Sequence, residues 1–278
     1  MARERISHKS DSEILLMREA GLITAAALQA VKEAIRPGVS TLELDAVAER
    51  TIQSFGATSN FKLVAGYQHT ICSSINDEVV HGIPSKDRIL VPGDIISIDC
   101  GAITKAGWNG DAAFSFIVPG GEAELMTNRQ KLSDTCEGSL WAGIAAFATA
   151  TRLNEVGRAV EQSIRARGAY GILQDYIGHG VGRSMHEDPA VFNYQTRDLG
   201  PVVENGLVIA IEPMITAGSQ AVKILADNWT VSTKDRSDSS HWEHTVARHS
   251  GGIWVLTAED GGVAGLAPYG ITPVPVES

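Results

Sequence analysis

Carboxylates inside otherwise apolar runs are the feature of this sequence that most restricts its fold. Asp99 lies within "IISIDCGAI", Asp111 opens "DAAFSF" and Glu212 interrupts "LVIAIEPMI", and these runs contain no Lys or Arg. A carboxylate buried alone in a sheet is costly unless a positive charge compensates it. We therefore expect a fold that brings these acids together, with a cation as the simplest compensating charge.

Asp99 and Asp111 are predicted to face one point. The segment between them, "CGAITKAGWNG", contains Gly107 and Gly110 and is typical of a hairpin. A hairpin returns the second strand beside the first, so the two carboxylates can share one face. The alternative is that Asp111, directly after Gly110, only caps a turn.

Two histidines follow in "GHGVGRSMHEDP". Glycines on both sides of His179 let the backbone approach closely and leave its imidazole accessible, and neutral imidazole is a common metal ligand. His186 can serve as an acid or base. A loop histidine alone more often has no special role, but the acidic strands favour the functional interpretation.

The segment "HWEHTV" begins at His241. Its histidines are three residues apart, whereas the zinc helix H-E-x-x-H needs four, and its Trp, Thr and Val favour a strand. In a strand, His241, Glu243 and Thr245 share one face and His244 points to the other. Glu243 is therefore a candidate metal ligand, and His244 is not.

Helices and strands are predicted to alternate in two similar rounds. Capping boxes at Ser10 with Glu13 and at Ser40 with Glu43 begin two helices, and two more fill residues 121–167. Strands follow each helical region, which indicates an α+β fold of two related halves with helices on one side of a curved antiparallel sheet. We expect one domain over residues 1–278, with peripheral tails at 1–9 and about 260–278. The second tail, rich in Gly and Pro, is expected to be irregular.

Composition excludes several classes of protein. A formal charge of −10 argues against a nucleic-acid-binding surface. We see no apolar stretch that approaches the roughly 18 residues of a membrane span and no signal peptide, so we expect a cytoplasmic protein. The three scattered cysteines fit neither a disulfide framework nor a Cys-x-x-Cys zinc site, and are expected to be small buried residues.

The sequence resembles the pita-bread fold metallopeptidases, and specifically a type I methionine aminopeptidase. The resemblance covers roughly residues 10–258 and rests on six motifs in order: "INDEVVHGIP", "PGDIISIDCG", "GWNGDAAFSF", "GHGVGRSMHEDP", "IEPM" and "NWTVSTKDRSDSSHWEHTV". Only 33 positions separate His179 from Glu212, which leaves no room for the helical insertion of type II enzymes. The alternatives are an X-Pro aminopeptidase, although the extra N-terminal domain of those enzymes is absent from this sequence, or a non-catalytic binding protein on the same fold.

The resemblance implies a site with two divalent metal ions, drawn from Mn, Fe, Co and Zn. It assigns Asp99 to one ion, His179 and Glu212 to the other, and Asp111 and Glu243 to both. Glu212 would also accept a proton from the attacking water. His81 and His186 would assist at the scissile amide, one as a proton or hydrogen-bond donor and one by positioning the carbonyl.

The resemblance also implies a tight apolar pocket for a methionine side chain. Its expected lining is Tyr67, Cys72, Met185 and Trp229, together with His81 and His186, although simple packing is an equal alternative for Cys72. Substrates would be N-terminal Met peptides and nascent chains with a small second residue. A transient contact with the ribosome and a monomeric state are expected.

The sequence departs from the family pattern in three places. Asp99 and Asp111 are twelve positions apart, one more than expected, and Asn109 stands where histidine is expected. An extra residue near Lys105 would lengthen the hairpin turn without changing the faces of the two strands. Met185 stands where relatives often have an aromatic residue.

Overall fold

The computed structural model describes residues 6–277 and contains four long helices in two pairs. Both predicted capping boxes are confirmed, because the Ser10 and Ser40 hydroxyls accept from the backbone three residues on. The helices are α1 (Asp11–Ala34), α2 (Thr41–Ser54), α3 (Ala123–Phe147), α4 (Asn154–Arg167) and the short α5 (Val263–Leu266), with 3₁₀ turns η1 (Phe61–Leu63) and η2 (Ala267–Tyr269).

Nine strands form one sheet in which every observed pairing is antiparallel. Its main path runs β1 (Thr58–Ser59), β4 (Ile95–Ile103), β5 (Asn109–Ile117), β14 (Glu243–His249), β9 (Val208–Ile211), β7 (Gly178–Gly180) and β8 (Glu187–Val191). Two further strands join it at the side, namely β2 (Ile71–Ile75) on β4 and β15 (Gly252–Val255) on β14.

Two small three-stranded sheets complete the fold. One has the order β13 (Ser239–His241), β10 (Met214–Thr216) and β6 (Gly171–Ile172). The other has the order β11 (Val222–Ile224), β12 (Val231–Thr233) and β3 (Glu78–Val80).

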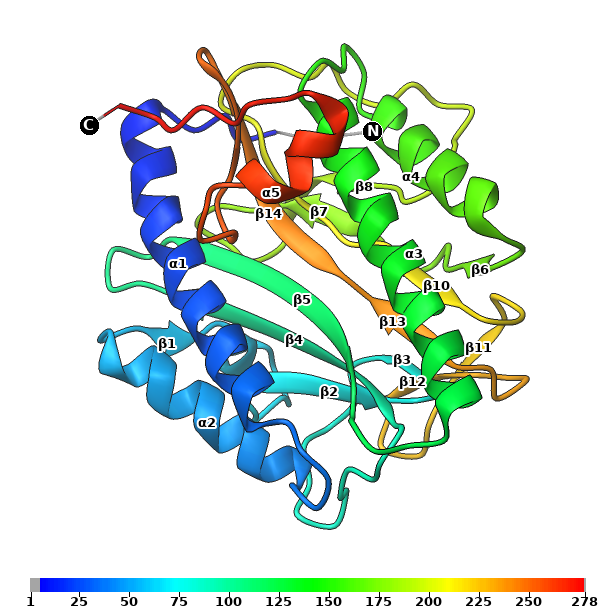
Figure 1. Ribbon diagram of the computed structural model, residues 1–278. Helices are drawn as coiled ribbons and strands as arrows, with labels where there is room; N and C mark the ends of the chain where they lie inside the picture. Colours follow the sequence, from blue (N-terminus) through cyan, green and yellow to red (C-terminus); the bar gives the residue numbers. More distant parts are fainter. Residues whose placement is uncertain (1–5, 278) are drawn as a thin grey trace.

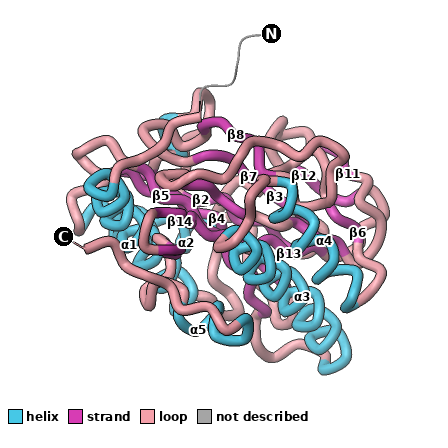
Figure 2. Tube along the Cα trace, turned by 90° about the horizontal axis from the view of Figure 1, so that it is seen from above, coloured by secondary structure: helices cyan, strands magenta, loops and turns pink. Residues whose placement is uncertain are grey.

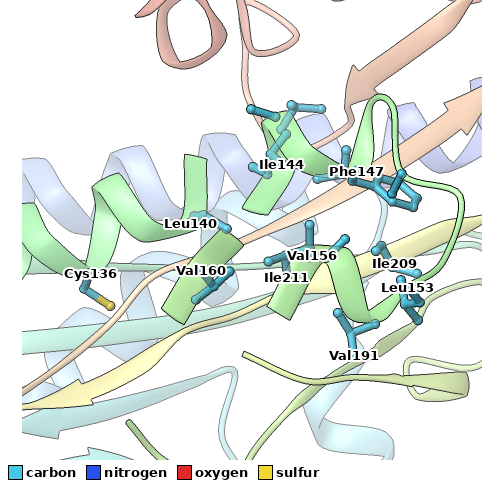
Figure 3. Packing of buried hydrophobic residues seen from close by; sticks show 14 of the residues in the cluster. Cys136, Leu140, Ile144, Phe147, Leu153, Val156, Val160, Val191, Ile209 and Ile211 are labelled. Carbon is cyan, nitrogen blue, oxygen red and sulfur yellow. The ribbon is translucent and has the colours of Figure 1, made fainter. Parts of the chain in front are cut away.

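The long helices α1 and α3 lie across one side of the strands, as predicted (Figures 1 and 2). Each half has its own apolar core. In the first, α1 and α2 pack on β2, β4 and β5; in the second, α3 and α4 pack on β9 and β14. Figure 3 shows the second core, where Leu140, Ile144 and Val160 from the helices belong to one buried cluster with Ile209 and Ile211 of β9. Trp242 contacts both cores and so lies where the two halves meet.

Helix α1 packs closely on β5 because two glycines meet there. A Cβ added at Gly110 would lie 2.7 Å from the backbone nitrogen of Gly21. A side chain at Gly110 would therefore push α1 away from the sheet that carries Asp111.

Four expectations from the sequence are wrong. The run "LVIAIEPMI" is two strands, β9 and β10, and "HWEHTV" is divided at Trp242 between β13 and β14. The C-terminal segment is not simply irregular, because residues 263–269 form α5 and η2 and Leu266 is fully buried. An apolar stretch of membrane-span length is also present, because helix α1 is long and apolar enough, by length and composition alone, to cross a membrane. Half of this stretch is buried in the fold.

Candidate functional site

The hairpin formed by β4 and β5 carries Asp99 and Asp111 on one face, as predicted. In its register Asp99 lies opposite Ala113 and Asp111 lies opposite Gly101, so the acids are diagonal neighbours. The turn at residues 104–108 includes Gly107 with φ of 78°. The longer connection is therefore absorbed in the turn, and the two strands keep their facing.

Strand β14 brings Glu243 to the same place. Glu243 lies opposite Ala113 on β5, and Asp99 lies opposite the same residue from β4, so β5 alone separates the two acids. The next residue on that face, Thr245, accepts a hydrogen bond from the Asp111 backbone N–H and donates one to the Asp111 carbonyl. These bonds fix β14 against β5 at the position of the acids.

His179 and Glu212 reach the site from β7 and from the end of β9. The Nε2 atom of His179 lies 3.4 Å from Oε1 of Glu212. The Nδ1 atom of His179 lies 3.0 Å from the carbonyl oxygen of Gly180, which fixes Nδ1 as the protonated nitrogen and leaves the Nε2 lone pair directed at the site.

A cavity of about 170 Å³ brings together all eleven residues predicted for the site. The cavity is lined by Tyr67, Cys72, His81, Asp99, Asp111, His179, Met185, His186, Glu212, Trp229 and Glu243. Phe61 and Val64 complete the lining; they could not be predicted from the sequence because nothing there distinguishes them from ordinary core residues. The cavity thus has an acidic end and an apolar end.

The apolar end is held by contacts among its own side chains and backbone. The rings of Tyr67 and Trp229 meet edge to face, with centroids 5.1 Å apart, and the Tyr67 hydroxyl donates to the carbonyl oxygen of Ile71 at 2.7 Å. Cys72 belongs to one buried apolar cluster with Phe61 and Tyr67 and also lines the cavity, so it has both a packing and a lining position. All three cysteines are buried and unpaired by disulfides, as expected.

Burial changes the pKa of every ionisable group at the acidic end. Burial raises the pKa of Asp99 to about 7. The pKa values of Asp111, Glu212 and Glu243 are also raised, first by burial and then by the charges of the neighbouring acids. Burial lowers the pKa of His179 to about 4, so its imidazole is neutral near pH 7.

The residues present fit divalent cations. Three buried carboxylate oxygens, Oδ1 of Asp99, Oδ1 of Asp111 and Oε1 of Glu243, have no hydrogen-bond partner among the described residues. Buried polar atoms are normally satisfied, and four carboxylates with one neutral imidazole are a donor set for divalent ions such as Mn, Fe, Co or Zn. Positive charge at this point would satisfy the oxygens and relieve the mutual repulsion of the acids.

His81 and His186 border the acidic end from two different loops. His81 has a left-handed backbone with φ of 60°, which is uncommon outside glycine, and its ring meets Tyr176 edge to face with centroids 5.8 Å apart. His186 is exposed, and its ring lies edge to face on His179 with centroids 4.3 Å apart. His244 lies outside the cavity, on the opposite face, as predicted.

Asn109 was noted in the sequence only as a departure, but it connects β5 to the loop of His179. It is buried, donates from Nδ2 to the Gly182 carbonyl at 2.9 Å and accepts from Asn60 at 3.2 Å. An amide can make both bonds at once.

Lys9 supports the same loop, although residues 1–9 were expected to be peripheral. Its Nζ atom lies 2.8 Å from Oε2 of Glu187, and the two side chains are 2% and 17% exposed. Glu187 also accepts from the backbone N–H of Ser184 at 3.1 Å. No sequence pattern signals this pair, because 178 positions separate its members.

The curved antiparallel sheet and its buried acidic site define a metallopeptidase of the pita-bread type. The chain belongs to metallopeptidase family M24, whose family model matches residues 15–248. Membership of this family implies the use of divalent metal.

Relatives of known name agree with this assignment. The chain is 45% identical over 260 residues to methionine aminopeptidase 1 of Mycobacterium tuberculosis, covering 92% of this chain and 96% of the relative. The crystal structure of methionine aminopeptidase from Thermotoga maritima superposes with a TM-score of 0.86 at 35% identity, covering 92% of this chain and all of that one. A prolidase from Pyrococcus furiosus superposes with a TM-score of 0.68 at 23% identity, covering 90% of this chain and 65% of the prolidase, and therefore shares the fold.

Proposed function

We propose that this chain is a metal-dependent aminopeptidase that removes the N-terminal methionine from nascent proteins when the second residue is small. The observation that carries the proposal is the single cavity in which an apolar chamber opens onto the acids. The chamber, lined in part by Tyr67 and Trp229, suits an unbranched thioether side chain, because sulfur contacts aromatic rings favourably. The relatives at 35–45% identity that are named methionine aminopeptidases support the same activity.

Two divalent ions are proposed, drawn from Mn, Fe, Co and Zn. Asp99 would hold one, His179 and Glu212 the other, and Asp111 and Glu243 would bridge both. Such a pair of ions lowers the pKa of a water toward neutrality and polarises the scissile carbonyl. The three carboxylate oxygens without partners support this set.

The remaining steps belong to side chains of the protein. Glu212 accepts a proton from the attacking water, a role that suits a carboxylate whose pKa is raised by burial and by the neighbouring charge of Asp99. His81 and His186 act on the amide, one donating a hydrogen bond or proton to the reacting group and the other positioning its carbonyl. Such bonds lower the barrier because they strengthen as charge develops on the oxygen.

Specificity is proposed to follow from the two ends of the cavity. The acidic end with its proposed metals would receive the free amino terminus of the substrate, which restricts cleavage to the first peptide bond. The methionine side chain enters the apolar end, between Tyr67, Cys72, Met185 and Trp229. The space beside the acids is proposed to admit only a small second residue, as the resemblance to methionine aminopeptidases implies.

A substrate panel tests the proposal. Purified protein is supplied in turn with Mn, Fe, Co or Zn and given Met-Ala-Ser, Met-Leu-Ser and an Ala-Pro peptide, and released amino acids are measured. We expect methionine from Met-Ala-Ser and little from the other two. Cleavage of the Ala-Pro peptide alone would favour an X-Pro aminopeptidase, and no cleavage with any of the four metals would favour a non-catalytic binding protein.

We also infer a single catalytic domain over residues 1–278 that works in the cytoplasm as a monomer and contacts the ribosome only transiently. The formal charge of −10 supports an enzyme that acts on protein ends and does not bind nucleic acid. Association with membranes is not expected, and the burial of half of the apolar stretch of α1 supports its role as a core helix.

A further inference from the structure

One buried histidine at the acidic end has no role in the proposed reaction. His241 is 2% exposed, and its Nε2 atom is buried without a hydrogen-bond partner among residues 6–277. This atom lies 3.8 Å from Oε2 of Glu212. The Glu212 carboxylate therefore lies between two imidazoles, with Oε1 toward His179 and Oε2 toward His241.

The two imidazoles differ in the partner of their other nitrogen. Nδ1 of His179 is held by the Gly180 carbonyl, so its Nε2 presents a lone pair. No carbonyl or carboxylate in the described part of the chain accepts from Nδ1 of His241. A metal-binding histidine almost always has such an acceptor. His241 is thus free to carry its proton on Nε2, the atom that faces Glu212.

The backbones of both residues are fixed. The His241 N–H donates to the hydroxyl of Ser115, and the same hydroxyl lies 3.0 Å from the His241 carbonyl oxygen. Asn193 donates from Nδ2 to the Glu212 carbonyl at 3.0 Å. The last side-chain torsion of Glu212, which turns its carboxylate, can still rotate, because terminal torsions of this kind have broad distributions. Rotation about this torsion can shorten the 3.8 Å separation between Oε2 of Glu212 and Nε2 of His241.

We propose that His241 is a positioning residue that donates a hydrogen bond from Nε2–H to Oε2 of Glu212. The bond occupies one carboxylate oxygen and directs the other, Oε1, to the side of His179. It therefore fixes the orientation in which Glu212 binds metal and accepts a proton. This inference rests on the proposed function for the proton step, but not for the orientation of Glu212.

Co(II) binding tests the inference without requiring turnover. The His241→Leu variant removes the donor, His241→Gln keeps an N–H donor, and His244→Gln is the matched control, since His244 is a histidine of the same segment whose Nδ1 pairs with Thr257 outside the site. Affinity is measured by calorimetry, and the Co(II) absorption bands report the ligand geometry. Thermal unfolding of each variant verifies that it is folded.

We expect His241→Leu to weaken Co(II) binding by about 10- to 100-fold and to change the absorption bands, as loss of an outer partner does. His241→Gln should stay within about threefold of the unaltered protein because its amide also donates. In a Glu212→Ala background, His241→Leu should change the affinity by less than about twofold, since the shared partner is already gone. If His241→Leu does not fold, His241→Met takes its place as a donor-free variant.

Two results would overturn the inference. Unchanged affinity and bands in the donor-free variant would show that His241 does not act on Glu212. An equal loss in His241→Gln would show that an amide donor cannot replace the imidazole, as for a direct metal ligand. Neither result depends on peptide cleavage: a protein that binds Co(II) as expected but releases no methionine would refute the proposed function and leave this inference intact.

Discussion

Asp99 and Glu243 lie opposite the same residue, Ala113, from strands on either side of it. Two carboxylates that are far apart in the sequence thus share one row across β4, β5 and β14. The row is defined by backbone pairing and not by the acids themselves, which repel one another. The fold therefore holds the acids together at an electrostatic cost that bound cations would offset.

Replacing Glu243 with Ala is expected to abolish turnover. The change removes a proposed bridging ligand and should weaken metal binding and lower kcat/KM at least about a thousandfold, which corresponds to roughly 4 kcal/mol. Calorimetric metal titration and release of methionine from Met-Ala-Ser measure both effects. Normal activity at saturating metal would contradict the role of Glu243 as a ligand.

His244→Ala is expected to affect stability and not catalysis. His244 packs on Trp141, and its Nδ1 atom lies 2.8 Å from the Thr257 hydroxyl, outside the cavity. The substitution should lower the free energy of unfolding by about 1–3 kcal/mol and keep kcat/KM within about tenfold. A loss of activity equal to that of His81→Ala would mean that the two faces of β14 are misassigned.

Lys9→Ala is expected to loosen the loop that carries His186. Glu187 would lose its buried partner, so we expect a loss of roughly 3 kcal/mol in stability and a raised KM. Lys62→Ala is the control, because the pair of Lys62 with Glu49 is more exposed and should contribute less than about 1 kcal/mol. Chemical denaturation of both variants measures the two losses in stability. Equal losses would contradict a special role for Lys9.

The metal-free protein is expected to lose stability as the pH rises from 6.5 to 8.5. Asp99 has its pKa raised to about 7 in the folded state, so the folded state binds more protons than the unfolded state, and its contribution is lost as the pH rises through that value. Three buried histidines, His179 and His244 with pKa values lowered to about 4 and His241 with a pKa lowered to about 3, act in the opposite direction, chiefly below about pH 6.5, where an unfolded histidine takes up a proton.

Thermal unfolding of metal-free protein across this range measures the effect. The Tm should fall by a few degrees, and Asp99→Asn should flatten the dependence because it removes one titrating group. A Tm that stays constant or rises with pH would contradict the raised pKa values.

Local signals in the sequence were sufficient for much of the fold. Both capping boxes fixed helix starts because Ser10 and Ser40 bond within their own first turns. The shared face of Asp99 and Asp111 follows from the period of two in a strand, which a longer turn does not alter. His241 and Glu243 also reach the same site, with donor atoms within 4.8 Å of one another and of Glu212.

Most of the features that could not be predicted depend on contacts between distant segments. The strand break at Trp242 arises because Ser239–His241 pairs with β10 and the following residues pair with β9, which no local pattern specifies. The pair of Lys9 with Glu187 and the approach of His241 to Glu212 have the same origin. α5 could not be predicted because its four residues give no helical period.

The most direct test of the account is a metal titration of metal-stripped protein in which Co(II) binding and release of methionine from Met-Ala-Ser are followed together. We expect no turnover in the stripped protein and turnover that rises with bound Co(II). In Glu243→Ala, both Co(II) binding and turnover should be much weaker than in the unaltered protein. Methionine release by fully stripped protein, or saturated Co(II) binding without any release, would contradict the assignment of this acidic cavity as a metal-dependent methionine aminopeptidase site.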